Sequence, residues 1–91
     1  MDTTLIPVPR PAIKIRNWGG KIILAIGTDA LELSESAELL WRTIDPGRSV
    51  DDIITRVAES YGLTSHEVAQ DVTEWLTEME ASGYLELRPR R

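Results

Sequence analysis

The chain of 91 residues contains no cysteine and no phenylalanine. The absence of cysteine excludes a disulfide framework, a thiolate metal site and a cysteine nucleophile. No apolar run approaches the roughly 20 residues that a transmembrane helix needs, and the first residues lack the basic start and apolar middle of a signal peptide. We therefore expect one small, soluble, cytoplasmic domain with a single hydrophobic core.

Basic residues are scarce in the C-terminal two-thirds of the chain. Residues 31–87 hold three basic and thirteen acidic side chains, a net charge of −10, whereas residues 1–30 hold four basic and two acidic ones, a net charge of +2. So acidic a surface repels phosphate backbones and anionic membranes and attracts basic partners. We therefore expect neither nucleic acid nor a membrane as partner.

Candidate catalytic groups are also missing. His66 is the only histidine, and no second histidine or cysteine stands at metal-ligand spacing, so the sequence predicts a surface histidine and no metal or other cofactor. Asp51 and Asp52 are adjacent and would point about 100° apart on a helix, where their expected role is to stabilise its N-terminus. We therefore expect that this chain is not an enzyme.

Three prolines stand at positions 7, 9 and 11 of the chain. Proline disrupts a helix and cannot occupy a central strand, so residues 1–11 are predicted to form an extended arm. We expect residues 12–87 to form the single domain and the arginine-rich residues 88–91 to form a basic tail.

The segment after the arm has the pattern of three short strands. Residues 13–16 alternate between isoleucine and basic side chains, which is typical of a strand with one buried face. A glycine pair then predicts a two-residue turn, and the uninterrupted apolar run 22–26 predicts a central strand. Residues 30–33 alternate again. Together they predict an antiparallel meander that needs helices on one face.

The rest of the chain is predicted to be helical, in three segments. Ser34 or Ser36 can cap the first helix, and Ser49 can cap the second. Thr64 and the glutamate three residues later form a capping box that opens the longest helix, 65–82. The order βββααα predicts an α+β, winged-helix-like fold, with a three-stranded antiparallel sheet followed by three helices.

Binding is the function that this composition leaves available. Trp75 lies at one border of the apolar stripe of the third helix, where it is either a core residue or the wall of a groove. Strand 30–33, if it is a sheet edge, either accepts an incoming peptide strand or is inert. Leu39 lies opposite the apolar stripe of the first helix and is either a lone exposed leucine or a contact for a partner. The acidic face of the third helix is either solvated or complementary to a basic peptide.

The order of several motifs resembles the PqqD-like family. The segments that carry the resemblance are ALELSESAELLW at 30–41, IDPGRSVDDI at 44–53, VAQDV at 68–72 followed by Trp75-Leu76, and Gly83-Tyr84-Leu85. The resemblance covers residues 12–87. One departure is Pro46, which separates Asp45 from Gly47 where the family has an Asp-Gly pair.

The resemblance implies a recognition element of pathways that make ribosomally synthesised and post-translationally modified peptides (RiPPs). In that family three strands pack on three helices, and the leader segment of the precursor peptide adds a strand to the third strand, with its side chains in the cleft beside the third helix. Transferred to this chain, the resemblance implies a backbone pairing surface and a side-chain cleft. Their residues are Ala30, Leu31, Glu32, Leu33, Val68, Asp71, Val72, Trp75 and Met79.

A chain of this size is most similar to the stand-alone B1 proteins of lasso-peptide pathways, which bind the leader and present it to a separate leader peptidase before a cyclase closes the ring. The resemblance therefore implies a precursor peptide and a leader peptidase as partners, with a cyclase as a further candidate. A chaperone of another pathway, such as that of pyrroloquinoline quinone, and a small subunit that docks on a larger enzyme are alternatives. A winged-helix DNA-binding regulator is a further alternative, against which the absence of Lys and Arg from residues 64–83 argues.

Overall fold

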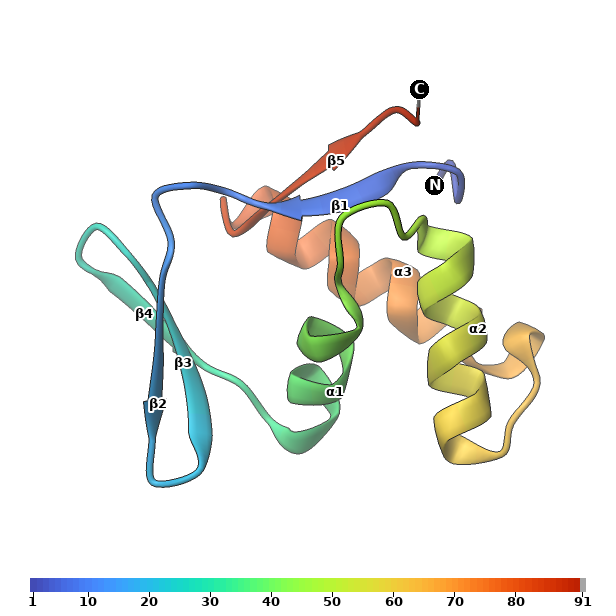
Figure 1. The fold of residues 1–91 in the computed structure, drawn as a ribbon, viewed down its shortest axis with the longest axis horizontal. Helices are drawn as coiled ribbons and strands as arrows, with labels where there is room; N and C mark the ends of the chain where they lie inside the picture. Colours follow the sequence, from blue (N-terminus) through green and yellow to red (C-terminus); the bar gives the residue numbers. More distant parts are fainter. Residues whose placement is uncertain (91) are drawn as a thin grey trace.

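The computed structural model describes residues 1–90, which form five strands and three helices (Figure 1). In chain order these are β1 (Ile6–Pro9), β2 (Lys14–Trp18), β3 (Lys21–Ile26), β4 (Asp29–Glu32), α1 (Glu35–Thr43), α2 (Val50–Tyr61), α3 (Ser65–Ala81) and β5 (Leu85–Arg88). The three-stranded sheet lies at one end of the molecule and the helices at the other, with β1 and β5 side by side across the top of the view in Figure 1.

Strands β2, β3 and β4 form an antiparallel sheet with β3 in the centre. Gly19 and Gly20 have φ angles of 59° and 80°, the left-handed values that a two-residue hairpin turn needs, and Trp18 pairs with Lys21 across this turn. The predicted α+β fold, with a three-stranded antiparallel sheet followed by three helices, is confirmed, and β3 is the expected central strand.

The buried face predicted for the first strand of this sheet is present only at Ile13, just before β2, which is half-buried against the core. Every residue of β2 is exposed, and Ile15 keeps 58% of its surface accessible. Ile15 lies opposite Leu24, so both side chains project from the same side of the sheet, yet Leu24 is fully buried. The helical layer therefore covers β3 and stops short of β2.

The prolines of the N-terminal segment occupy a paired strand. β1 pairs antiparallel with β5, and the Arg10 N–H donates to the Tyr84 carbonyl at 3.1 Å. Because hydrogen bonding alternates along such a pair, the nitrogens of Pro7 and Pro9 lie on the outer side of β1, where no ladder bond is lost. The spacing of two residues between prolines thus allows a strand and blocks its outer edge against further pairing.

The N-terminal segment also provides hydrogen-bond acceptors for the first N–H groups of α2. The carbonyls of Leu5 and Thr3 accept hydrogen bonds of 2.9 Å each from the N–H groups of Val50 and Asp51, two of the donors that a helix N-terminus leaves unpaired. The chain preceding β2 is therefore bound to both β5 and α2. Of the predicted tail 88–91, Arg88 belongs to β5 and Arg91 lies outside the described residues.

Local capping signals set the helix boundaries. Ser34, Ser49 and Thr64 cap α1, α2 and α3, and each side-chain oxygen accepts a hydrogen bond from the backbone N–H three residues further on. Gly62 ends α2 with a φ of 66°. The core between the helices and β3 contains fully buried side chains from β3, α2, α3 and β5, namely Leu24, Val50, Ile53, Val72, Leu76 and Leu85.

Candidate functional site

Strand β4 leaves one side of its backbone open. Among the described residues it pairs only with β3, and the Leu33 N–H donates to the Ile22 carbonyl at 2.9 Å just beyond the strand. Because bonding alternates along an antiparallel pair, Leu31 also bonds to β3, whereas the N–H and C=O groups of Ala30 and Glu32 face the opposite way. Both of these residues are exposed, so this edge can form a ladder with an added strand.

A hollow of about 330 Å³ separates β4 from the C-terminal half of α3. Its lining comes from the end of β4, the start of α1 and one side of α3, and consists of Leu31, Glu32, Leu33, Ser34, Ala37, Trp75, Glu78, Met79 and Ser82. Leu33 and Met79 are only 3% exposed and form its apolar floor. A strand added to β4 would direct alternate side chains toward this hollow.

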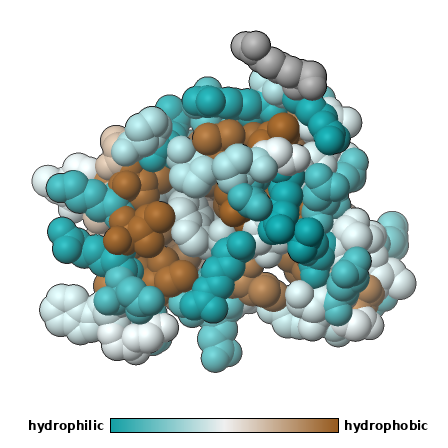
Figure 2. All heavy atoms as spheres, viewed as in Figure 1, coloured by the Kyte–Doolittle hydropathy of each residue, from teal (hydrophilic) through white to brown (hydrophobic). Residues whose placement is uncertain are grey.

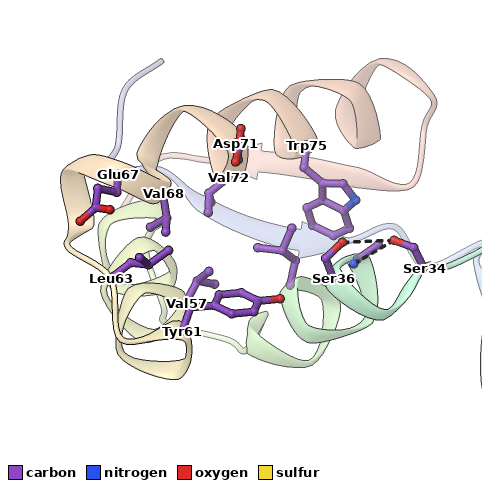
Figure 3. A pocket seen from close by; sticks show the side chains of 12 residues that line it. Ser34, Ser36, Val57, Tyr61, Leu63, Glu67, Val68, Asp71, Val72 and Trp75 are labelled. Atoms are coloured by element: carbon purple, nitrogen blue, oxygen red, sulfur yellow. Dashed lines mark hydrogen bonds between the residues drawn. The ribbon is translucent and has the colours of Figure 1, made fainter.

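A second hollow, of about 450 Å³, lies between the three helices (Figure 3). In that view Val68, Val72 and Trp75 project from α3 toward α1 and α2. The wall opposite α3 consists of Ser34, Ser36, Ala37, Leu40, Val57, Tyr61 and Leu63. Glu67 and Asp71 are also in the lining, and both are exposed, so carboxylates border an otherwise mainly apolar cavity.

Trp75 joins the two hollows. It is half-buried, packs against the core and lines both cavities, as do Ser34 and Ala37. The position predicted at the border of the apolar stripe is therefore compatible with both interpretations of this tryptophan, since the residue packs against the core and also lines a groove. In Figure 3 the ring lies over the first turn of α1, close to Ser36.

Eight of the nine residues implied by the family resemblance line these two neighbouring cavities. Trp75 lines both hollows. Of the other seven, four line the hollow beside β4, namely Leu31, Glu32, Leu33 and Met79, and three line the hollow between the helices, namely Val68, Asp71 and Val72. Ala30 lines a separate depression beside Tyr84 and offers its backbone at the open edge. The structure thus places eight of the nine in two adjoining depressions along α3 and β4, and Ala30 in a third depression beside them.

The sequence interpretation missed the contribution of α1 and α2. Ser36, Ala37 and Tyr61 line the hollow between the helices, and Tyr61 is 52% exposed although it continues the apolar stripe of α2. An aromatic residue at the C-terminal end of a stripe, where the helix leaves the core, was the available signal. The expectation that Leu39 is exposed is wrong, because this residue is half-buried and lines neither cavity.

The surface around the site is negatively charged. The acidic side chains of α3 are Glu67, Asp71, Glu74, Glu78 and Glu80, and the helix contains no Lys or Arg. Within residues 1–90 no ion pair involves any of them, since the carboxylates that do pair are Glu32, Glu38, Asp45 and Glu86. A basic segment that approaches α3 therefore meets uncompensated carboxylates.

Among the described residues, the site does not bring together side chains suited to catalysis or metal binding. The part of the chain that the structure describes holds no cluster of His, Asp and Glu suited to a metal ion, and His66 is exposed. None of the described helices combines the length and the apolar character needed to cross a membrane. The arrangement offers an open strand edge, two apolar depressions and carboxylates, which together suit binding of an extended peptide.

Comparison with known proteins identifies the family. A family model described as Coenzyme PQQ synthesis protein D (PqqD) matches residues 20–85, which include β3, β4 and all three helices. No curated protein and no solved structure matches the chain. The chain therefore belongs to the PqqD family, whose members are non-catalytic recognition elements that bind the precursor peptides of RiPP pathways.

Proposed function

We propose that this member of the PqqD family binds the leader segment of a precursor peptide by adding it as a strand to β4, against α3, and presents it to a separate enzyme. The observation that carries this proposal is the outward direction of the backbone groups of Ala30 and Glu32, beside a cavity walled by Trp75. Main-chain bonds to these groups supply affinity that does not depend on the leader's side chains.

Specificity then comes from the two depressions. In a strand bound beside β4, every second side chain points to the same side of the sheet as Leu31 and Leu33, toward the hollow in front of Met79. We expect apolar leader residues at these alternate positions. Where the leader continues past the end of β4, Trp75 and Ala37 connect this hollow to the one between the helices, which can accept another apolar side chain.

The acidic face of α3 defines a second feature of the ligand. Carboxylates at the border of the helical hollow, including Glu67 and Asp71, favour a leader with lysine or arginine next to its apolar residues. The same carboxylates argue against the winged-helix DNA-binding alternative, because α3 would then be the reading helix and would approach phosphates with an acidic surface.

Within the RiPP pathways, we infer a lasso-peptide pathway in the cytoplasm, with a leader peptidase as the partner and a cyclase as a further candidate. This inference rests on the overall resemblance to the stand-alone leader-binding proteins of those pathways, since the motifs of the chain are those of the PqqD family as a whole. The pathway of pyrroloquinoline quinone is the alternative. The genes beside that of this chain separate the two, because a leader peptidase and an asparagine-synthetase-like cyclase would accompany a lasso precursor.

Binding of a fluorescein-labelled leader, taken from the precursor encoded beside this chain, tests the proposal. Trp75→Ala removes the wall shared by the two hollows, and we expect it to weaken binding by about 2 kcal/mol, or roughly 30-fold. Trp18→Ala is the matched control, because Trp18 lies on β2 and lines neither hollow. Equal affinity of a folded Trp75→Ala variant and the wild type would contradict the proposed site.

A further inference from the structure

Two large hydrophobic side chains of β2 contribute little to the core. Trp18 is 76% exposed and Ile15 is 58% exposed, the highest values among the exposed large hydrophobic residues. The others are Met1 at the chain end and Tyr61 and Leu63 at the helical hollow. In Figure 2 hydrophobic side chains come to the surface over the three-stranded sheet, at the left of the view, among hydrophilic ones.

The alternation of a strand places Trp18 on a defined surface. Lys14, Arg16 and Trp18 stand two residues apart on β2 and share one side of the sheet. Ile23 lies opposite Arg16, so it shares that side as well, and it is half-buried. The buried Leu24 points to the other side. We call the surface formed by Lys14, Arg16, Trp18, Lys21 and Ile23 the outer face of the hairpin.

Apart from Glu32, which lies opposite Ile23 and shares this side of the sheet, the outer face is basic, whereas the helical part of the molecule is acidic. Residues 3–28 contain four basic side chains, at positions 10, 14, 16 and 21, and no acidic one. Lys21 pairs with Glu32 at 3.7 Å, and the carboxylates within residues 1–90 form no such pair with Lys14 or Arg16. An exposed tryptophan beside two uncompensated cations has the composition of a protein-interaction hot spot.

The charge distribution favours a protein over an anionic polymer as the occupant. A nucleic acid or an anionic membrane extends beyond a patch of this size and would meet the acidic helical region, residues 31–87, with its net charge of −10. A folded protein can present an acidic patch limited to the outer face. The patch also needs an apolar recess, because Trp18 loses most of its exposed surface only inside a pocket.

We propose that the outer face of the hairpin is a second docking surface, which binds an acidic patch of a partner protein with a recess for Trp18. The inference rests on the proposed function and deepens it, since a chain that presents a peptide to an enzyme needs a contact with that enzyme. Strand β3 separates β2 from β4, so the β2 residues of this face, Lys14, Arg16 and Trp18, lie about 10 Å from the open edge and leave it free.

Photo-cross-linking in the producing cell tests this surface in the full chain. A photoreactive benzoylphenylalanine replaces Trp18 in one strain and Thr55, an exposed residue of α2, in a control strain. We expect an adduct at position 18 with a modifying enzyme of the same pathway, attached within an acidic segment, and none at position 55. Adding Lys14→Glu and Arg16→Glu to the position-18 strain should lower the adduct yield at least about tenfold.

Binding measurements then separate this inference from the proposed function. The purified partner should bind Arg16→Glu and Trp18→Ala at least about tenfold more weakly than wild type, while labelled leader binds both variants with unchanged affinity. Three results would overturn the docking surface. They are the lack of a specific adduct, an adduct with nucleic acid, lipid or a second copy of the chain, and an adduct whose yield does not change on charge reversal. If the wild-type chain did not bind the leader, the proposed function would be overturned instead.

Discussion

Substitution of Glu32 by proline tests the direction in which the β4 backbone groups point. In the free chain the Glu32 N–H faces away from β3, so its removal breaks no bond of the sheet. The residue before proline is restricted to extended conformations, and Leu31 is already in a strand. The only other interaction lost is the ion pair with Lys21, at 3.7 Å between two side chains that are 60% exposed, which contributes less than about 1 kcal/mol.

The loss of peptide binding should be larger than the loss of stability. One backbone hydrogen bond to the bound leader contributes a net 0.5–1.5 kcal/mol, about 1 kcal/mol on average. The proline ring also occupies the space of the missing proton and pushes the added strand away, so the combined effect should reach about 2–3 kcal/mol, a 30- to 150-fold weaker affinity. The melting temperature should fall by no more than a few degrees, in proportion to the ion pair.

Fluorescence anisotropy with the labelled leader, together with thermal unfolding, measures both quantities. Glu32→Ala is the matched control, because it removes the same ion pair and keeps the N–H, and it should bind nearly as well as the wild type. Leu31→Pro is the opposite control, because it removes a donor to β3 and should destabilise the fold. The reasoning is refuted if a folded Glu32→Pro variant binds the leader as tightly as Glu32→Ala.

Three further predictions concern the framework of the site. Deletion of residues 1–9 removes β1 and two carbonyl acceptors of α2, so urea denaturation should show a loss of about 3 kcal/mol or more; an unchanged midpoint would mean that this segment does not stabilise the fold. Gly20→Ala places a side chain at a φ of 80°, and the expected cost of about 1 kcal/mol should lower the melting temperature by about 4–8 °C. Hydrogen bonds from Ser49, first from its backbone N–H and then from its side chain, hold the pKa of Asp52 below its ordinary value of 3.8. This carboxylate therefore stabilises the fold fully above that pH, and its contribution falls as the pH drops through the lowered pKa. Asp52→Asn should therefore flatten the acid limb of the stability profile, and an unaltered limb would contradict the capping role.

Local signals made most of the helical part predictable from the sequence. Ser49 and Thr64 each satisfy a backbone donor three residues ahead, and the glycine after α2 adopts the left-handed conformation, so both boundaries depend on neighbours in the chain. The pairing of β1 with β5 could not be predicted in this way. It joins residues about 80 positions apart, and its one sequence signal, prolines at every second position, also fits an unpaired extended arm.

The candidate site was predictable in part, where it depends on strand order and on the periodicity of a helix. The β4 edge follows from strand order, and Trp75 follows from its place on a helical stripe. The exposure of Ile15 could not be predicted, because alternation shows which side of a strand is apolar and not how far the helices extend over that side. Likewise, the part that Tyr61 takes in the helical hollow depends on how α2 lies against α3, which no short pattern encodes.

Amide hydrogen exchange at β4, with and without saturating leader peptide, tests the central claim most directly. In the free chain the amides of Ala30 and Glu32 should exchange rapidly, while those of Leu31 and Leu33, which bond to β3, should be protected. On addition of the leader, we expect exchange at Ala30 and Glu32 to slow by at least about tenfold, with Leu31 and Leu33 changing much less. If the leader binds and exchange at Ala30 and Glu32 stays as fast as before, the peptide is not held as a strand on this edge.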